Sequence, residues 1–173
     1  MKRPLFLFLF FLSLLFAAAA PAAAQGLAED SSEASDPVVF ETSKVIISGG
    51  GIDGAAREYS FMVELALSTR QRARGLMFRE RLADDVGMLF LYDSEARRHM
   101  WMENTMVPLD MLFFDKNGGI TRIEHEARPY SKRPISSGGP ALGVLELAGG
   151  TAQGLGIVVG DRILHPLLPP TAK

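Results

Sequence analysis

Apolar residues alternate with more polar ones at every second position from Tyr59 to Leu67. Successive side chains of a β-strand point to opposite faces, so this period of two predicts a strand with one buried face. Segments rich in glycine, proline and asparagine separate it from other apolar segments that suit strands, at residues 38–47, 87–92, 97–102, 109–115, 120–127 and 142–147. Many short strands and few helices favour a mainly β fold (β-rich α+β), a compact barrel- or sandwich-like domain with one or two short helices.

Two short helices and two connections are expected between these strands. Ser68 and Gln71 have the spacing of a capping box, which predicts a short basic helix ending near Gly75. Residues 149–156 suit a second short helix. Residues 116–119 contain the Asn-Gly pair that favours a type I′ hairpin turn, and residues 128–140, with three prolines, are expected to form a long surface loop.

The first 24 residues have the layout of a secretory signal peptide. Lys2 and Arg3 precede an apolar run at residues 5–16, and small residues ending at Ala24 follow. The run is too short for a stable transmembrane span, so cleavage near Ala24 is favoured over a retained membrane anchor. We expect a periplasmic or secreted protein with a flexible leader, one globular domain and a loose tail, at residues 25–36, 37–166 and 167–173.

Cleavage would leave 149 of the 173 residues, enough for one domain with a hydrophobic core. It removes two of the 18 Lys and Arg residues and none of the 20 Asp and Glu, so the net charge becomes −4. An acidic balance argues against nucleic acid as the main partner. The chain contains no cysteine, which excludes disulfides, thiolate chemistry and cysteine metal sites.

Linked motifs from Arg74 onward resemble those of a known family. They are RGLMFR, GMLF, MWMENTMVPLDMLFF, VLEL and a late GLGIVVGD, and the likeness runs from about Tyr59 to Ile163. The pattern is similar to that of domain of unknown function family 192, whose members are often exported. The resemblance implies a compact β-rich domain. It implies no reaction, because the family has no established activity.

Charged residues within these motifs are candidates for a site. Arg74 and Arg79 flank an apolar Leu-Met-Phe segment and could clamp an anion or a carboxylate. Alternatively, they pair inside the fold with Asp110 or Glu146, acids placed within apolar strands. Asp110 and Glu146 could also act together as a general acid and base, as in glycoside hydrolysis, if both reach one cleft.

The predicted strand at residues 97–102 and the connection after it contain further candidate residues. Asn104 and Thr105 either fix a turn through their side chains or contact a ligand. Trp101 could anchor an interface or a sugar. His99, Met100 and Met102 combine imidazole and thioether groups that suit Cu(I). However, Met100 and Met102 share one face of a strand and His99 the other, which favours core packing over a metal site.

Three functions follow from these residues. The favoured one is a non-enzymatic binding or interaction module of the cell envelope that uses no cofactor. Its site would comprise Arg74, Arg79, Trp101, Asn104, Thr105 and Asp110, and its partner would be a small molecule, a glycan or an envelope protein. The second is an acid/base hydrolase of envelope glycans that uses Asp110 and Glu146. The third is a carrier of a soft metal that uses the methionine, histidine and tryptophan side chains.

Overall fold

The computed structural model describes residues 37–50 and 55–170. The predicted signal peptide at residues 1–24 and the predicted leader at residues 25–36 lie outside these described residues. No helix within the described ranges is long and apolar enough to cross a membrane. At the other end, Leu168 is 7% exposed and belongs to the hydrophobic core, so core packing continues past the predicted domain boundary at residue 166.

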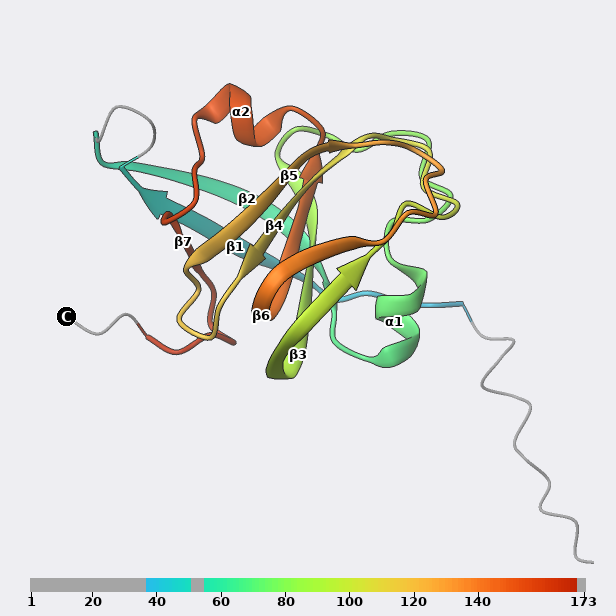
Figure 1. Cartoon of the computed structure of the whole chain (residues 1–173), viewed down its shortest axis with the longest axis horizontal. Coiled ribbons are helices and arrows are strands. Elements are labelled where there is room, and N and C mark those ends of the chain that lie inside the picture. Colours follow the sequence, from blue (N-terminus) through green and yellow to red (C-terminus); the bar gives the residue numbers. More distant parts are fainter. Residues whose placement is uncertain (1–36, 51–54, 171–173) are drawn as a thin grey trace, which may run out of the picture. The chain divides into compact units, whose positions relative to one another are not determined.

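The described residues form one seven-stranded sheet in the order β5-β4-β6-β3-β2-β1-β7, with two short helices. The strands are β1 (Thr42–Gly49), β2 (Arg57–Ala66), β3 (Val86–Met100), β4 (Leu109–Phe114), β5 (Ile120–Ala127), β6 (Ile135–Ala148) and β7 (Arg162–Leu164). Only β2 and β3 pair in parallel. The helices are α1 (Thr69–Arg74) and α2 (Thr151–Leu155), which follow β2 and β6 (Figure 1). The predicted mainly β fold is therefore confirmed.

Two clusters of buried side chains lie on opposite faces of the sheet. The first, the inner core, takes residues from all seven strands, including Ile120 of β5 and Ile163 of β7. Because these two outer strands contribute to one cluster, the sheet curls toward it. The second, the outer core, contains residues such as Met88, Phe90 and Met111 and is covered by Leu76 and the segment after β3.

The two outer strands of the curled sheet meet at one end. The Ile120 amide donates to the Asp161 carbonyl at 2.8 Å, and the Gly160 amide donates to the Ile120 carbonyl at 2.9 Å. The Ile163 amide donates to the Gly118 carbonyl at 2.8 Å. Backbone groups that an open sheet would leave unpaired at its edges are thus satisfied here.

Helix α1 begins and ends as the sequence predicts. The Ser68 hydroxyl accepts a hydrogen bond from the Gln71 amide at 3.1 Å, and the Gln71 side chain accepts one from the Ser68 amide at 2.9 Å, so the capping box is confirmed. Gly75 ends the helix with φ of 48° and donates its amide to the Gln71 carbonyl. Glycine suits this position because it has no Cβ to clash there.

Strand β3 differs from the prediction of separate strands at residues 87–92 and 97–102. It runs unbroken from Val86 to Met100, and its register against β6 shifts between Leu91 and Ala96 and again between Arg97 and His99. The polar residues between the two predicted strands are exposed and stay extended through a bulge. The strand then ends at Met100, two residues earlier than predicted.

The hairpin between β4 and β5 exists, but its predicted turn type is wrong. A type I′ turn needs positive φ at both central residues, whereas Gly118, at φ 81°, is the one residue of 115–119 with positive φ. The Gly118 amide donates to the Asp115 carbonyl at 2.9 Å. This is a type I turn followed by a left-handed glycine. The Asp115 carboxylate reinforces it by accepting from the amides of Asn117 and Gly119.

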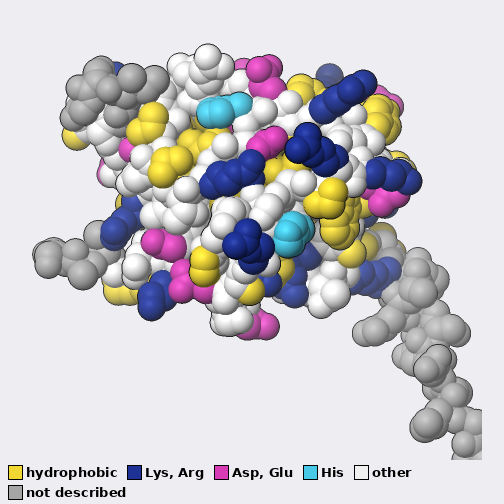
Figure 2. Space-filling model, in the orientation of Figure 1, with side chains coloured by type: hydrophobic (Ala, Val, Ile, Leu, Met, Phe, Trp, Pro, Cys, Tyr) yellow, Lys and Arg dark blue, Asp and Glu magenta, His cyan; other side chains and the backbone are white. Residues whose placement is uncertain are grey.

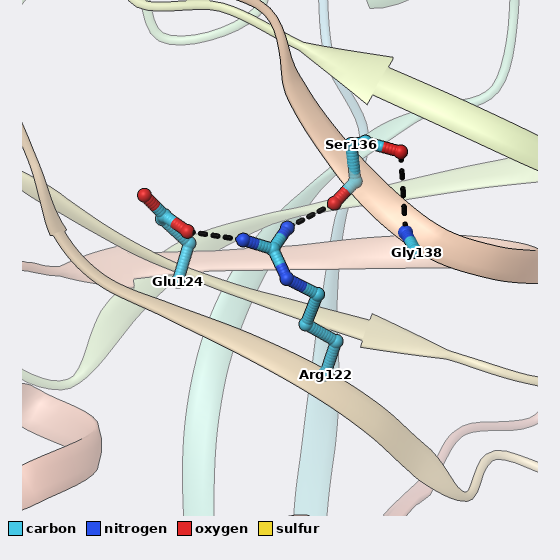
Figure 3. A network of polar contacts seen from close by, with 4 residues as sticks. All are labelled: Arg122, Glu124, Ser136 and Gly138. Atoms are coloured by element: carbon cyan, nitrogen blue, oxygen red, sulfur yellow. Dashed lines mark hydrogen bonds and ion pairs between the residues drawn. The ribbon is translucent and has the colours of Figure 1, made fainter.

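The predicted loop at residues 128–140 is too long, because β6 already begins at Ile135. Residues 135–141 of β6 pair with the end of β3. Strand β4 pairs with β6 only from Gly143 of β6 onward, so this early part of β6 has one free side. Proline and glycine are tolerated on a strand with one free side, and Pro140 lies here. Figure 3 shows Arg122 of β5 reaching across to the Ser136 carbonyl while it pairs with Glu124, which holds this segment against the sheet.

Asp110 is fully buried and joins three separate segments of the chain. Its carboxylate accepts hydrogen bonds from the amides of Glu126 at 2.8 Å, Gly150 at 3.1 Å and Ala152 at 2.7 Å. Asp110 lies at the start of β4, Glu126 near the end of β5, and Gly150 and Ala152 in the first turn of α2. The three bonds satisfy the buried charge without a cation.

We predict that Asp110→Asn lowers the free energy of unfolding by about 3 kcal/mol or more, because asparagine turns an amide donor toward backbone N–H groups and leaves them unpaired inside the core. Asp115→Asn is the matched control, since its partly exposed turn needs only the oxygen that asparagine keeps, and it should cost less than about 1 kcal/mol. Urea unfolding of both variants measures the difference. Equal losses would contradict the role given to Asp110.

Candidate functional site

The two acids predicted as a catalytic pair lie on opposite faces of the sheet. Asp110 is paired with Leu147 across β4 and β6, and Met111 is paired with Glu146. Neighbouring positions of a strand point to opposite faces. Asp110 therefore lies on the inner-core side with Leu147, and Glu146 lies on the outer-core side with Met111. The structure does not bring the two carboxyls into one cleft.

Neither of the two predicted arginines forms an ion pair with Asp110 or Glu146 among the described contacts, although Arg74 lines the same pocket as Glu146. Arg79 forms an ion pair with Glu64 of β2. Arg74 lies over the Phe78 ring, with its guanidinium carbon 4.7 Å from the ring centre. The pairing of these arginines with Asp110 or Glu146, which the sequence offered as an alternative, is absent among the described contacts.

Glu146 is a buried acid without a partner. Its side chain is 3% exposed and lies on the central strand β6, between Met88 of β3 and Met111 of β4. No hydrogen bond or ion pair joins its carboxyl to any described residue. The described residues contain no fully enclosed side-chain nitrogen or oxygen that lacks a partner. The Glu146 carboxyl therefore reaches a space rather than a neighbouring group.

That space is a pocket of about 230 Å³ between the outer core, helix α1 and the end of β3. We call it the Glu146 pocket. Its apolar lining comes from Leu76, Met77, Phe90, Met100 and Trp101, and its polar lining from Thr69, Arg72, Arg74, Tyr92, His99, Thr105 and Glu146. Pockets with apolar walls and a few convergent polar groups are the usual form of small-molecule sites.

Burial raises the pKa of Glu146 to about 8. The charged form is disfavoured because apolar side chains replace water around it. At neutral pH Glu146 is therefore mainly a neutral carboxylic acid, which can donate a hydrogen bond as well as accept one. A ligand that enters the pocket meets this group at its buried end.

Tyr92 lies between two cations and faces the same pocket. The guanidinium carbons of Arg72 and Arg98 lie 4.8 Å and 3.8 Å from its ring centre. Burial raises the pKa of Tyr92, the two arginines oppose this, and Glu146 adds a small further increase. The Tyr92 hydroxyl has no hydrogen-bond partner among the described residues. Arg72 is itself fixed by the carbonyls of Leu67 and Leu91.

Backbone strain gathers beside the pocket wall. Phe78, Asn104 and Tyr130 have φ of 65°, 54° and 59°, in the left-handed region that bulky side chains rarely adopt. The Phe78 amide donates to the Asn104 carbonyl at 2.8 Å, and the Tyr130 amide donates to the Thr105 carbonyl at 3.0 Å. These bonds hold three loops together around the segment that carries Trp101, which is 48% exposed. Asn104 forms the turn and directs its side chain toward the Met77 sulfur at 3.9 Å.

The residues suggested for a soft metal are divided. His99 and Met100 line the Glu146 pocket, because the strand ends at Met100 and alternation stops there. Met102 is fully buried in the outer core. The described residues contain no group of three histidine or acidic side chains that could hold a metal ion. Arg72 and Arg74 line the same pocket, and their charge opposes a cation.

The sequence identified six residues of the pocket and missed others. Arg74, His99, Met100, Trp101, Thr105 and Glu146 were singled out and lie together, whereas Arg79, Asn104 and Asp110 do not line the pocket. Arg72 and Tyr92 were missed. In the sequence, Arg72 looks like an ordinary exposed arginine of a helix, and Tyr92 looks like the last residue of a strand. A short basic helix followed by a strand that contains aromatic residues was the available signal.

A second hollow lies between β2 and α2. Its volume is about 670 Å³, and Tyr59, Asp84, Asp85 and Leu155 are among the residues that line it. The two aspartates are exposed, and the Tyr59 hydroxyl donates to the Leu155 carbonyl at 2.6 Å. The hollow is larger than the Glu146 pocket, but it contains no buried unpaired group that a ligand would satisfy.

Known families and structures resemble the chain over most of its folded part. The family DUF192, described as "Uncharacterized ACR", matches residues 52–165. A crystal structure from Sinorhizobium meliloti, described as a candidate transcription regulator, is 39% identical with a TM-score of 0.70, covering 75% of this chain and 97% of the other. A protein of unknown function from Novosphingobium aromaticivorans is 36% identical with a TM-score of 0.68, covering 77% and 95%. No curated protein matches the chain.

We predict that the unpaired Glu146 makes the fold less stable as pH rises. The unfolded carboxyl loses its proton near pH 4.5, whereas the folded one keeps it to about pH 8. The contribution of Glu146 to the free energy of unfolding should therefore be highest below about pH 4.5 and fall by at most about 1.4 kcal/mol per pH unit up to about pH 8.

Two variants remove the titrating group: Glu146→Gln keeps a similar shape, and Glu146→Met matches the neighbouring methionines. In both, the decrease in the free energy of unfolding with pH should be absent, and both should be more stable than the native protein at about pH 8. Urea unfolding at several pH values tests this, with Glu80→Gln as an exposed control for the same chemical change. Parallel pH profiles for native protein and Glu146→Gln would refute it.

Proposed function

The chain belongs to the DUF192 family, to which no activity is assigned, and we therefore propose from its own residues that it is a non-enzymatic binding protein for a small organic molecule. The ligand occupies the Glu146 pocket. One observation carries this proposal: Glu146 is only 3% exposed, and its unpaired carboxyl opens to a pocket with apolar walls. Burying such a group costs about 1–3 kcal/mol unless something bonds to it, and a ligand can supply that bond.

The placement of the other acid supports binding over hydrolysis. Glycoside hydrolysis of the usual kind needs two carboxyls that flank one bond. Asp110 is fully buried behind the sheet, and its carboxylate is occupied by three backbone amides. Glu146 has no second acid among the residues lining its pocket. A binding role needs neither a second acid nor a cofactor.

The surface around the pocket also suits binding. Figure 2 shows Lys and Arg side chains next to exposed hydrophobic ones on the side of the molecule where Figure 1 places α1. Trp101, at 48% exposure, is the side chain of this surface best suited to close over a bound molecule, because tryptophan covers a large area with few rotatable bonds. The proposal does not include regulation of transcription, since the chain has a net charge of −2.

We place this binding function in the periplasm or outside the cell. The layout of residues 1–24, with two basic residues, an apolar run and small residues up to Ala24, supports export and cleavage. In that compartment the protein would meet nutrients, envelope fragments or other proteins of the envelope. The absence of cysteine means that its folding does not depend on the oxidising conditions there.

The first experiment is an intact mass under non-denaturing conditions, measured on protein purified from its own host. We expect a small organic molecule to accompany the native protein and to be lost from Glu146→Met, while Glu80→Gln keeps it. The denatured mass of each sample provides the baseline. A bare native protein under these conditions, together with no binding in a screen of small organic molecules, would contradict the proposed function.

Export makes a separate prediction for the same sample. The denatured mass should correspond to a chain that begins at Gln25, because cleavage after Ala24 removes the first 24 residues. The protein should be recovered from the periplasm or the medium. A full-length chain in the membrane fraction would instead indicate that the apolar run is kept as an anchor.

A further inference from the structure

We propose that the Glu146 pocket selects an organic anion: a carboxylate, or another small oxyanion, carried on an apolar body about the size of one ring. This inference names the ligand class of the binding function proposed above and rests on it. Two O–H groups without partners, a surplus of positive charge and the shape of the pocket lead to it independently.

The two O–H groups are those of Glu146 and Tyr92. Both side chains line the pocket. Neither the Glu146 carboxyl nor the Tyr92 hydroxyl forms a hydrogen bond with another described residue. The two are near enough to interact, because a charge on Glu146 would raise the pKa of Tyr92. A neutral carboxylic acid and a phenol each donate one hydrogen bond. Two O–H donors that line one pocket suit a ligand oxygen that can accept two hydrogen bonds. A negatively charged oxygen accepts hydrogen bonds more strongly than a neutral one.

The charges around the pocket favour the same kind of ligand. Arg72 and Arg74 line it, and no acidic residue other than Glu146 does. The Arg74 guanidinium lies against the Phe78 ring and forms no ion pair within the described part of the chain. Arg98 adds a further positive charge behind Tyr92. A cationic ligand would meet two guanidinium groups, whereas an anion would be attracted by both.

Arg72 and Arg98 are held in place before a ligand arrives. Arg72 donates to the carbonyls of Leu67 and Leu91, and Arg98 donates to the carbonyls of Ser94 and Ala141. Each guanidinium also packs on the Tyr92 ring. Because carbonyl groups fix the arginines without neutralising them, their positive charge remains available to the pocket. Preorganised charge of this kind loses little freedom on binding.

The walls and volume define the body of the ligand. Leu76, Phe90 and Trp101 provide apolar contact, and the volume is about 230 Å³. An apolar cavity of roughly 150 Å³ suffices for benzene, so one ring with a charged substituent fits and a long acyl chain does not. The oxyanion would lie toward Glu146 and Tyr92, with the ring against Phe90 and Trp101.

Three probes with one ring and different charge test the inference on the full mature protein: benzoate, benzamide and benzylamine. At about pH 6 Glu146 keeps its proton. We expect benzoate to bind at least about tenfold more tightly than benzamide, since a hydrogen bond to a charged group is worth about 1.5–3 kcal/mol. Benzylamine should bind more weakly than both. Quenching of Trp101 fluorescence and titration calorimetry give the affinities.

Variants then separate the donors from the general charge. Tyr92→Phe should lower the affinity for benzoate by about tenfold and the affinity for benzamide by less. Arg74→Gln should lower the affinity for benzoate and leave the affinity for benzamide unchanged. Arg81 is exposed and does not line the pocket, so Arg81→Gln should change neither affinity. Glu146→Met should reduce the preference for benzoate, because one of the two donors is lost while Tyr92 and Arg74 remain. Unfolding midpoints establish that each variant is folded.

The outcomes distinguish this inference from the function on which it rests. Equal or tighter binding of benzamide or benzylamine overturns selection of an anion, although the pocket would still be a binding site. No binding of any probe at millimolar concentration also overturns the inference, and the native mass measurement then decides separately whether the pocket binds another molecule. If Arg81→Gln weakens benzoate as much as Arg74→Gln does, the attraction is a property of the whole surface and not of the pocket.

Discussion

The three hydrogen bonds to the Asp110 carboxylate fix the arrangement on which the rest of the fold depends. They join the start of β4 to the end of β5 and to the first turn of α2, segments that are up to 42 positions apart in the chain. Helix α2 has no side chain that caps its N-terminus, and the Asp110 carboxylate takes that role from a neighbouring strand. With α2 held at the end of β6, the inner core closes under Ala152 and Ile157.

The register that Asp110 helps to fix also decides the surroundings of Glu146. β6 runs beside β4, so Leu147 faces Asp110 and Glu146 is turned to the outer core. A slip of one residue would exchange these faces and place both acids together. The same sheet thus contains one buried acid whose charge is fully satisfied and one that is left unpaired. Of the two acids, Glu146 lines the pocket and Asp110 does not. Their positions alone therefore distinguish Asp110 as a structural acid from Glu146 as a functional candidate.

Much of this fold follows from local patterns in the sequence. The period of two in β2, the continuous apolar run of β4 and the capping box of α1 each specify their element through nearest neighbours. The faces of Asp110 and Glu146 could not be predicted, because they depend on a register between strands far apart in sequence. The role of Tyr92 was hidden for a similar reason: Arg72 and Arg98, which enclose its ring, come from a helix and from the far end of the same bulged strand.

Several departures from ordinary folding rules lie in or beside the Glu146 pocket. Glu146 lacks a partner, Phe78 and Tyr130 adopt left-handed backbone, and Trp101 is half exposed. Among the described residues, fully enclosed polar side-chain atoms are bonded. Strain and unpaired groups lower stability, and they persist at sites where they serve a function. Glu126 is a further described non-glycine residue with left-handed backbone, and it lies beside Asp110. Left-handed backbone therefore does not mark the pocket by itself, and the unpaired buried carboxyl of Glu146 is the feature that favours a binding role.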